Sequence, residues 1–215
     1  MDKYRETGET WNKVATVYED KFMHLTLYNE SYDLICHTIA KPQANLLEIG
    51  CGPGNITRYL LSKRPDFNVL GIDVAPNMVA LAIKNNPTAH FEVMDCRQIG
   101  RLHKKFDGII AGFCIPYLSN EDSIKLIAAA SHLLNDQGLL YISFVEGDPA
   151  KSAFQVGSSG DRVYFYYHQL ALLNEVLLQH GFECPQVFKV DYETKDGTVE
   201  VHTIVIAQLK PLSMG

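Results

Sequence analysis

The sequence predicts an α/β fold: a doubly wound, mostly parallel sheet of seven strands, with helices on both faces and an antiparallel hairpin at its C-terminal end. Three observations lead to this fold class. Short apolar segments alternate with helix-like segments from residue 46 to residue 146. The chain before this region has helical periodicity, and two strand-like segments joined by a tight-turn signal come last. Parallel strands need helical crossovers, whereas a tight turn joins antiparallel strands.

The N-terminal part of the chain, residues 10–40, is expected to be helical. Its apolar residues recur at helical spacing in two groups: Val14, Val17, Tyr18, Phe22, and then Leu34, Ile35, Thr38, Ile39. Pro42 ends this region, because proline cannot continue a helix.

The alternating region supplies five expected strands. They are "NLLEIG" (45–50), "NVLGID" (68–73), "HFEVMD" (90–95), "FDGIIAG" (106–112) and "LLYISFVE" (139–146). Expected helices at 76–85 and 120–135 separate some of these strands, and the first of them has Pro76 near its start.

This rhythm stops at residues 147–161, "GDPAKSAFQVGSSGD", which show no period. The segment is too long for an ordinary connector, so we expect it to be functional or mobile. A helix over 168–180 follows and ends at Gly181. The last two strands, "PQVFKVDYE" and "TVEVHTIVIAQLK", are joined by "TKDG", whose Asp196-Gly197 pair is a hairpin signal.

Composition restricts the class of protein. A chain of 215 residues suits a single domain, with or without additions. The formal net charge is −6 and no basic run occurs, so a nucleic acid is an unexpected partner. No apolar stretch is long enough to span a bilayer, and the polar start "MDKYRETGETWNK" resembles neither a signal nor a transit peptide.

Cysteine and histidine usage adds two expectations. The five cysteines are scattered and form no Cys-x-x-Cys pair, which favours free thiols in a reducing cytoplasm. No histidine pair has metal-ligand spacing near a carboxylate or cysteine, so no metal site is expected. The sequence leaves the oligomeric state open.

Three glycines, Gly50, Gly52 and Gly54, lie between the first strand and the helix-like stretch after it. Bare backbone at such a turn lets a ligand approach, and the helix that follows points free N–H groups toward it. The dinucleotide-binding fingerprint requires its third glycine one position later, where this chain has Asn55. The glycine pattern alone is therefore weak evidence for a dinucleotide.

Three carboxylates, Glu48, Asp73 and Asp95, come at the ends of three successive expected strands. Acids around one glycine turn are poorly suited to a pyrophosphate. They suit a ligand that carries a cation, a ribose diol and an exocyclic amine, and S-adenosylmethionine (SAM) has all three.

At this point the sequence resembles the class I, Rossmann-like SAM-dependent methyltransferases of small-molecule type. The resemblance covers nearly the whole chain in order, through "WNKVATVYEDKF" (11–22), "LLEIGCGPGNITRYL" (46–60), "VLGIDVAPNMVALA" (69–82), "VMDCRQI" (93–99), "FDGIIAGFCIPYL" (106–118) and "LNDQGLLYISFVE" (134–146). It implies an N-terminal helical lid region (1–45), a SAM-binding domain (46–215) and a substrate loop near 147–163, within one domain overall.

The resemblance also implies roles around the methionine part of SAM. Glu48 would orient the glycine loop and favour the amino group, and Tyr18 would close over the carboxylate. Tyr18 suits a core aromatic position equally well. The implied residues at this end are Tyr18, Glu48, Gly50, Cys51, Gly52 and Gly54, with Ala111 and Phe113 beside the methyl group.

At the adenosine end, Asp73 would accept hydrogen bonds from both ribose hydroxyls, because a carboxylate has several acceptor sites. Val74 and Met78 would lie against the adenine, Asp95 would accept its amino group, and the Cys96 N–H would serve a ring nitrogen. Asp73 and Asp95 are alternatively turn residues at strand ends, and Met78 is alternatively part of the core.

The catalytic residues are less clearly implied. Many small-molecule members have a histidine after the fourth strand, where this chain has Pro116 and Tyr117. Our candidates are Tyr117, Glu146 and His168. Glu146 ranks first as a base, since ligands of α/β sheets bind at the carboxyl ends of strands. His168 is alternatively a surface residue at a helix start.

The function that follows is methyl transfer from SAM to a small-molecule acceptor by direct displacement. One alternative is a non-catalytic SAM-binding module. Another is an NAD(P)-dependent oxidoreductase, which Asn55, the three acids and the terminal hairpin disfavour. An RNA methyltransferase is disfavoured by the net charge.

Overall fold

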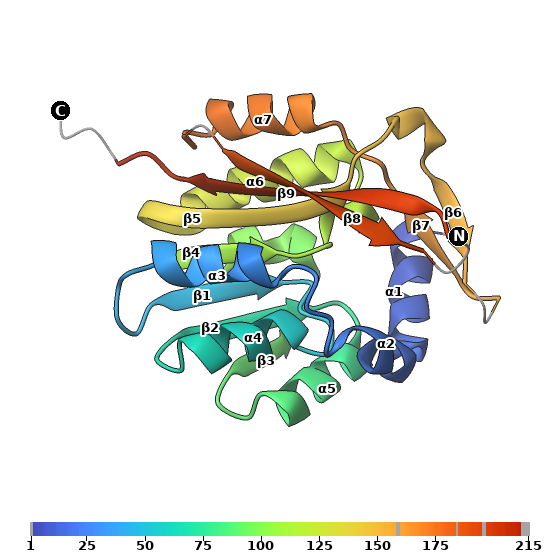
Figure 1. The fold of residues 1–215 in the computed structure, drawn as a ribbon, viewed down its shortest axis with the longest axis horizontal. Helices are drawn as coiled ribbons and strands as arrows, with labels where there is room; N and C mark the ends of the chain where they lie inside the picture. The colour runs from blue at the N-terminus through green and yellow to red at the C-terminus, as the bar shows by residue number, and fades with distance from the viewer. Residues whose placement is uncertain (1, 158–159, 184, 195–196, 212–215) are drawn as a thin grey trace.

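The protein is described by a computed structural model over residues 2–157, 160–183, 185–194 and 197–211. A seven-stranded sheet runs through it in the order β3-β2-β1-β4-β5-β9-β8 (Figure 1). The strands are β1 (Asn45–Ile49), β2 (Asn68–Asp73), β3 (His90–Val93), β4 (Phe106–Ala111), β5 (Leu134–Val145), β8 (Gln186–Glu193) and β9 (Val199–Gln208). The first five are parallel, and β9 runs antiparallel to both β5 and β8. The predicted fold class is confirmed.

Helices cover both faces of this sheet, and side chains that alternate along each strand meet them. Leu46 packs in the cluster that contains residues of α3 (Asn29–Thr38) and α4 (Asn55–Lys63). Its neighbour Leu47 packs in the cluster formed with α6 (Asn120–Leu133) and α7 (Leu170–Gln179). Because these strands are buried on both faces, their sequences are continuous apolar runs, and these runs allowed the strands to be predicted.

The helix α5 (Pro76–Asn85) has the predicted bounds, because Pro76 is favoured in a first helical turn and Met78, Val79 and Ala82 bury one face. The predicted end of α6 at residue 135 is wrong. Leu134 leaves the helix and pairs with Phe106 of β4, so β5 begins five positions before the predicted residue 139.

The N-terminal helices begin earlier than predicted. Asp2 accepts a hydrogen bond of 3.1 Å from the Tyr4 amide and caps α1 (Lys3–Lys13), which is followed by α2 (Ala15–Phe22). Both helices lie at the end of the sheet where the parallel strands finish (Figure 1). They therefore stand over the edge at which ligands of α/β sheets bind.

The expectation of an aperiodic loop over 147–161 is wrong for the part that the structure describes. A 3-10 turn, η3 (Pro149–Lys151), leads into β6 (Ala153–Val156), which pairs antiparallel with β7 (Arg162–Phe165). No residue of either strand is fully buried, so the hairpin produces little of the apolar periodicity by which strands are recognised. Of the predicted Asp196-Gly197 turn, Asp196 lies outside the described residues.

No helix in the described part of the chain is long and apolar enough to cross a membrane.

Candidate active site

A cavity of about 330 Å³ opens at the carboxyl ends of the parallel strands, a size within the range of small-molecule sites. Its floor comes from the loops after β1, β2, β3 and β4, and its cover comes from α1 and α2. Thirteen residues were predicted to bind a cofactor, and nine of them line this cavity: Tyr18, Gly50, Gly52, Asp73, Val74, Met78, Asp95, Cys96 and Phe113. The other four, Glu48, Cys51, Gly54 and Ala111, lie buried behind it.

The glycine loop has two kinds of glycine. Gly52 has a φ of +52° and borders the cavity, and a Cβ placed on it would lie 3.6 Å from the Tyr18 ring. Gly54 has a φ of +81°, and a Cβ there would collide with the amide of Asn86, which donates a 3.0 Å hydrogen bond to the Gly54 carbonyl. Gly52 thus keeps space at the cavity, whereas Gly54 allows α4 and α5 to pack together.

Asp73 ties the loop after β1 to the loop after β2. Its Oδ2 accepts a 2.9 Å hydrogen bond from the Gly52 amide, and its Oδ1 accepts one of 2.9 Å from the Ala75 amide. Burial raises the pKa of Asp73, and the backbone N–H groups oppose that rise. A carboxylate has about four lone-pair sites, so acceptor capacity remains toward the cavity.

Glu48 is 1% exposed and lies beneath the loop. Its Oε2 accepts hydrogen bonds from the Thr57 hydroxyl and, at 3.1 Å, from the Thr57 amide in the first turn of α4. Its Oε1 is buried and has no partner among the described residues. Burial raises the pKa of Glu48 to about 7, although the bonds from Thr57 oppose the rise. The unpartnered oxygen is a place for a proton or for a cationic ligand group.

Asp95 caps η1 (Cys96–Arg101) by accepting the Arg97 amide at 2.9 Å, and its carboxylate also pairs with the Arg97 guanidinium at 2.5 Å. Burial alone would raise the pKa of Asp95, but the bonds from Arg97 lower it. Arg97 in turn lies over the Tyr4 ring, 4.1 Å from its centroid. The carboxylate therefore stays ionised at the wall of the cavity that follows β3.

Aromatic side chains form the opposite wall. Trp11 packs edge-on against Tyr18 and Tyr117, with ring centroids 5.5 and 5.3 Å apart. The Trp11 Nε1–H is buried without a partner among the described residues. Phe113 borders the cavity beside this wall, with a left-handed φ of +51°, and its amide donates 2.8 Å to the Ser143 hydroxyl. A non-glycine residue in this region of φ is uncommon and clusters at functional sites.

The three catalytic candidates lie in different places. Tyr117 lines the cavity. Glu146 lies outside it and is paired with Lys189 on β8. His168 is fully buried, also outside the cavity, where its ring nitrogens lie 2.8 Å from the Ile115 carbonyl and 2.8 Å from Asn120. Glu146 and His168 therefore connect neighbouring segments of the fold, and neither contacts the cavity.

One group of cavity residues was missed by the sequence analysis. Tyr4, Thr7, Gly8 and Trp11 all come from α1 and face the cavity. Their spacing of three, one and three residues is the i, i+3, i+4, i+7 pattern of one helix face. The pattern is present in the sequence, but the face is hard to recognise because it includes Gly8 and is surrounded by polar residues.

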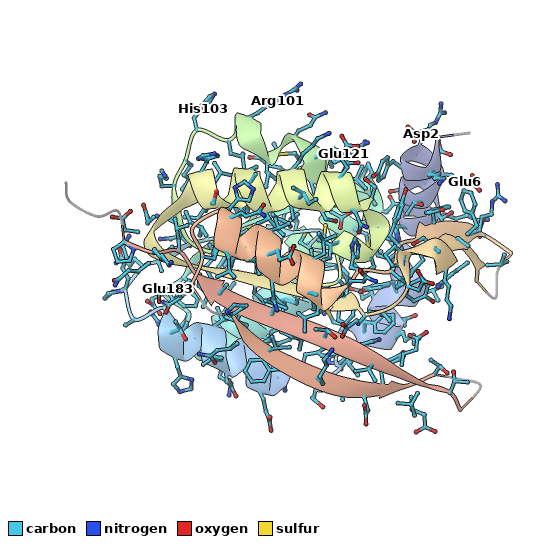
Figure 2. The ribbon with its side chains drawn as sticks, turned by 90° about the horizontal axis from the view of Figure 1, so that it is seen from above. Asp2, Glu6, Arg101, His103, Glu121 and Glu183 are labelled. Carbon is cyan, nitrogen blue, oxygen red and sulfur yellow. The ribbon has the colours of Figure 1, made fainter. Side chains whose placement is uncertain are left out.

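The hairpin β6–β7 holds α1 from outside. The Tyr164 amide donates 2.9 Å to the Thr7 hydroxyl, and the Thr10 hydroxyl donates 2.8 Å to the Arg162 carbonyl. Glu6 pairs with Arg162, and Figure 2 shows Glu6 and Asp2 on α1 at the end of the molecule where the hairpin lies. The cover of the cavity is therefore a two-layer structure of helix and hairpin.

Comparisons with known proteins agree with this geometry. Residues 46–138 match a family described as a methyltransferase domain. The "Putative methyltransferase 235L" of Invertebrate iridescent virus 6 is 30% identical over 117 residues, which are 54% of this chain and 42% of that protein. An uncharacterized methyltransferase of Alkaliphilus oremlandii is 26% identical over 167 residues, which are 72% of this chain and 76% of that protein.

A solved structure shares the fold at lower identity. It is magnesium protoporphyrin IX methyltransferase from Synechocystis PCC 6803 with bound SAM, with a TM-score of 0.72 at 15% identity and 98% of each chain covered. This chain spans less than half the length of the viral relative.

Proposed function

From the match of residues 46–138 to a methyltransferase domain, we propose that the chain is a class I SAM-dependent methyltransferase that transfers the methyl group of SAM to a small-molecule acceptor. The observation that carries the proposal is the Asp73 carboxylate. It is fixed by the amides of Gly52 and Ala75 and has acceptor capacity left toward the cavity. A ribose diol presents two hydroxyl donors and suits such a group.

The residues of the cavity fit SAM in their chemistry. The bare Gly52 leaves room for the methionine part, and Asp73 suits the ribose. The unpartnered Glu48 oxygen, buried beneath the glycine loop, suits a proton or the field of a cationic amino group. Val74 and Met78 offer an apolar shelf for adenine, and the ionised Asp95 offers an acceptor for its amine. We assign these roles to the chain on that basis.

Around the methyl group we place Phe113 and Tyr117, with the Trp11 indole beside them. SAM supplies an activated methyl carbon bonded to a sulfonium. The protein then has to exclude water and hold the acceptor in line, which can contribute several kcal/mol. The aromatic wall suits both tasks, since ring faces also favour a nearby cation.

The division of the chain follows from this assignment. We propose that residues 1–45 act as a lid, that residues 46–215 form the SAM-binding domain, and that the segment 147–163 belongs to the acceptor side. The contacts of Thr7 and Thr10 with the hairpin support a joint movement of the two covers. Cys36, Cys51, Cys96 and Cys114 are free thiols, which supports our placement of the protein in the reducing cytoplasm.

Two measurements test the proposal. Calorimetry should detect binding of SAM and of S-adenosylhomocysteine, its demethylated product, and no binding of NADH. Incubation with SAM and fractionated small metabolites should then give a product heavier by one methyl group, read by mass spectrometry, and the product should be absent with Asp73→Ala. Binding of NADH without binding of SAM would refute the assignment.

A further inference from the structure

A second polar cluster lies beside Phe113, outside the residues that line the cavity. Tyr28, which precedes α3, and His202 of β9 are 8% and 6% exposed. The Tyr28 hydroxyl is 2.6 Å from His202 Nδ1 across 174 residues of sequence. Glu200 Oε2 is 3.6 Å from the other ring nitrogen, Nε2. The three groups form a line of exchangeable protons that the proposed function does not use.

This cluster is at the ligand edge of the sheet. His202 pairs with Val145, the last residue of β5, because β9 runs antiparallel and begins where β5 ends. Phe113 follows β4 and contacts both members, with its ring centroid 4.7 Å from that of His202 and 5.3 Å from that of Tyr28. One aromatic ring, on a backbone in the left-handed region, therefore contacts the pair and also borders the cavity.

The protonation states suit a relay. Burial lowers the pKa of His202, although Glu200 opposes this, so the imidazole is neutral near pH 7 and can accept a proton. Burial, reinforced by Tyr192, raises the pKa of Tyr28, so its hydroxyl stays protonated and donates to Nδ1. The titratable groups that face His202 are Tyr28, Glu200 and Tyr192, whose ring stacks on the imidazole at 4.8 Å. From α2, Lys21 lies 5.7 Å from the Tyr192 ring.

We propose that Tyr28 and His202 are the proton-accepting pair of the acceptor subsite, and that the acceptor is an aromatic molecule with an acidic hydroxyl group. This inference rests on the proposed function. The acceptor would enter against Phe113, and its ring would lie among aromatic side chains, which contact such molecules well. Glu200 is a positioning residue, which holds His202 Nε2–H and favours the imidazolium.

The proposed methyl transfer balances in bonds, protons and charge. The acceptor O–H bond breaks as its oxygen bonds the methyl carbon, and that proton passes to the Tyr28 oxygen. The Tyr28 proton passes to His202 Nδ1, which becomes an imidazolium beside Glu200. The carbon–sulfur bond breaks with its electron pair on sulfur, so the positive charge lost there equals the charge gained on His202.

His168, another histidine at this edge of the sheet, is not suited to pass a proton onward. The bonds of His168 go to a backbone carbonyl and to an amide, and neither group can carry a proton onward. The chain of Glu200, His202 and Tyr28 ends instead in a tyrosine hydroxyl, and the ring of this tyrosine packs against Phe113, which borders the cavity.

The test uses 4-nitrophenol, an aromatic hydroxyl probe whose anion is yellow, with protein saturated in S-adenosylhomocysteine. The probe should ionise more in the complex than free at the same pH. Tyr28→Phe and His202→Gln should each lower the ionised fraction about tenfold, the effect of one pKa unit. Tyr32→Phe is the matched control, because it is a tyrosine 4% exposed whose ring lies 6.4 Å from that of Tyr28, and it should ionise the probe like the unaltered protein.

Equal ionisation by all four proteins, or no extra ionisation by the unaltered protein, would overturn the inference. Should a variant fail to fold, nitrogen NMR of the histidine rings in the unaltered protein gives the same decision: the probe should protonate His202 Nδ1 and leave His168 unchanged. Trp11 emission reports binding of S-adenosylhomocysteine separately. Product binding without probe ionisation refutes the relay alone, whereas loss of product binding refutes the proposed function as well.

Discussion

Asp73 and Gly52 are joined by a hydrogen bond of 2.9 Å, from the Gly52 amide to Asp73 Oδ2, across 21 residues of sequence. The carboxylate that faces the cavity therefore also holds the glycine loop in place. Its other oxygen accepts the Ala75 amide at the start of α5. A change at Asp73 therefore alters the cavity wall and also removes a bond that holds the glycine loop.

We expect Asp73→Ala to lower SAM affinity at least about tenfold, because two charge-assisted hydrogen bonds of about 1.5–3 kcal/mol each are lost. Asp73→Asn, which keeps one acceptor oxygen, should lose less. Calorimetry measures both, and circular dichroism checks that each variant is folded. Unchanged affinity in a folded Asp73→Ala protein would remove the ribose role.

Gly52 and Gly54 should respond differently to substitution. Gly52→Val should abolish SAM binding with a modest loss of melting temperature, because the side chain enters the cavity at a φ that disfavours it. Gly54→Ala should instead lower the melting temperature strongly, because its Cβ meets Asn86 between α4 and α5. Cys51→Ala, directly before Gly52, is the control and should keep SAM affinity. The reverse order of effects would contradict the geometry of the loop.

Glu48 should make stability depend on pH. Its pKa is about 7 in the folded protein and about 4.3 in an unfolded chain. Between these values the folded state binds the extra proton, so the free energy of unfolding falls as pH rises, by at most about 1.4 kcal/mol per pH unit. Denaturant titrations from pH 5 to pH 7 should show this slope, relative to Glu48→Gln, which lacks it.

Glu121→Gln, at an exposed carboxylate paired with Lys125, is the control for that series and should keep the slope of the unaltered protein. Parallel curves for the unaltered protein and Glu48→Gln would show that Glu48 is ionised in the fold.

The cover of the cavity should close more firmly on the ligand. SAM or S-adenosylhomocysteine should shift the emission of Trp11 and slow trypsin cleavage after Lys151 and Arg162. Thr7→Val leaves the Tyr164 amide without its acceptor, so it should reduce the protection at least about fivefold. Thr10→Val removes an exposed bond to the same hairpin and should change it little. Equal cleavage rates with and without saturating ligand would exclude a cover that closes on the ligand.

Much of the fold was predictable because local chemistry determines it. Pro76 and the spacing of Met78, Val79 and Ala82 fix α5 to the residue. The start of β5 was missed, since Leu134 joins the sheet only through Phe106, a partner 28 positions away that periodicity does not reveal. The hairpin β6–β7 was missed for a similar reason, because α1 holds it through polar contacts.

The candidate site also has residues that local sequence predicts and residues that it does not predict. The glycine loop and Asp73 are contiguous motifs, and their positions follow from the ends of neighbouring strands. Glu146 directly follows β5, but it forms an ion pair with Lys189 outside the cavity, and no local sequence pattern predicts that pair. Tyr28 and His202 meet only after β9 has joined the sheet, so the sequence carried no sign of them.

The reversed direction of β9 has a consequence for variation in this protein. Its first residues, and not its last, reach the edge where the parallel strands end, and within the sheet β9 pairs with the parallel strands through β5. Under the proposed function, substitutions at Val199 and Glu200 should therefore change the preferred acceptor while strands β1–β4 keep their shape. A mutant library confined to this strand start would be a compact test of that expectation, because Val199 is exposed, Glu200 is half-buried, and both lie outside the buried core.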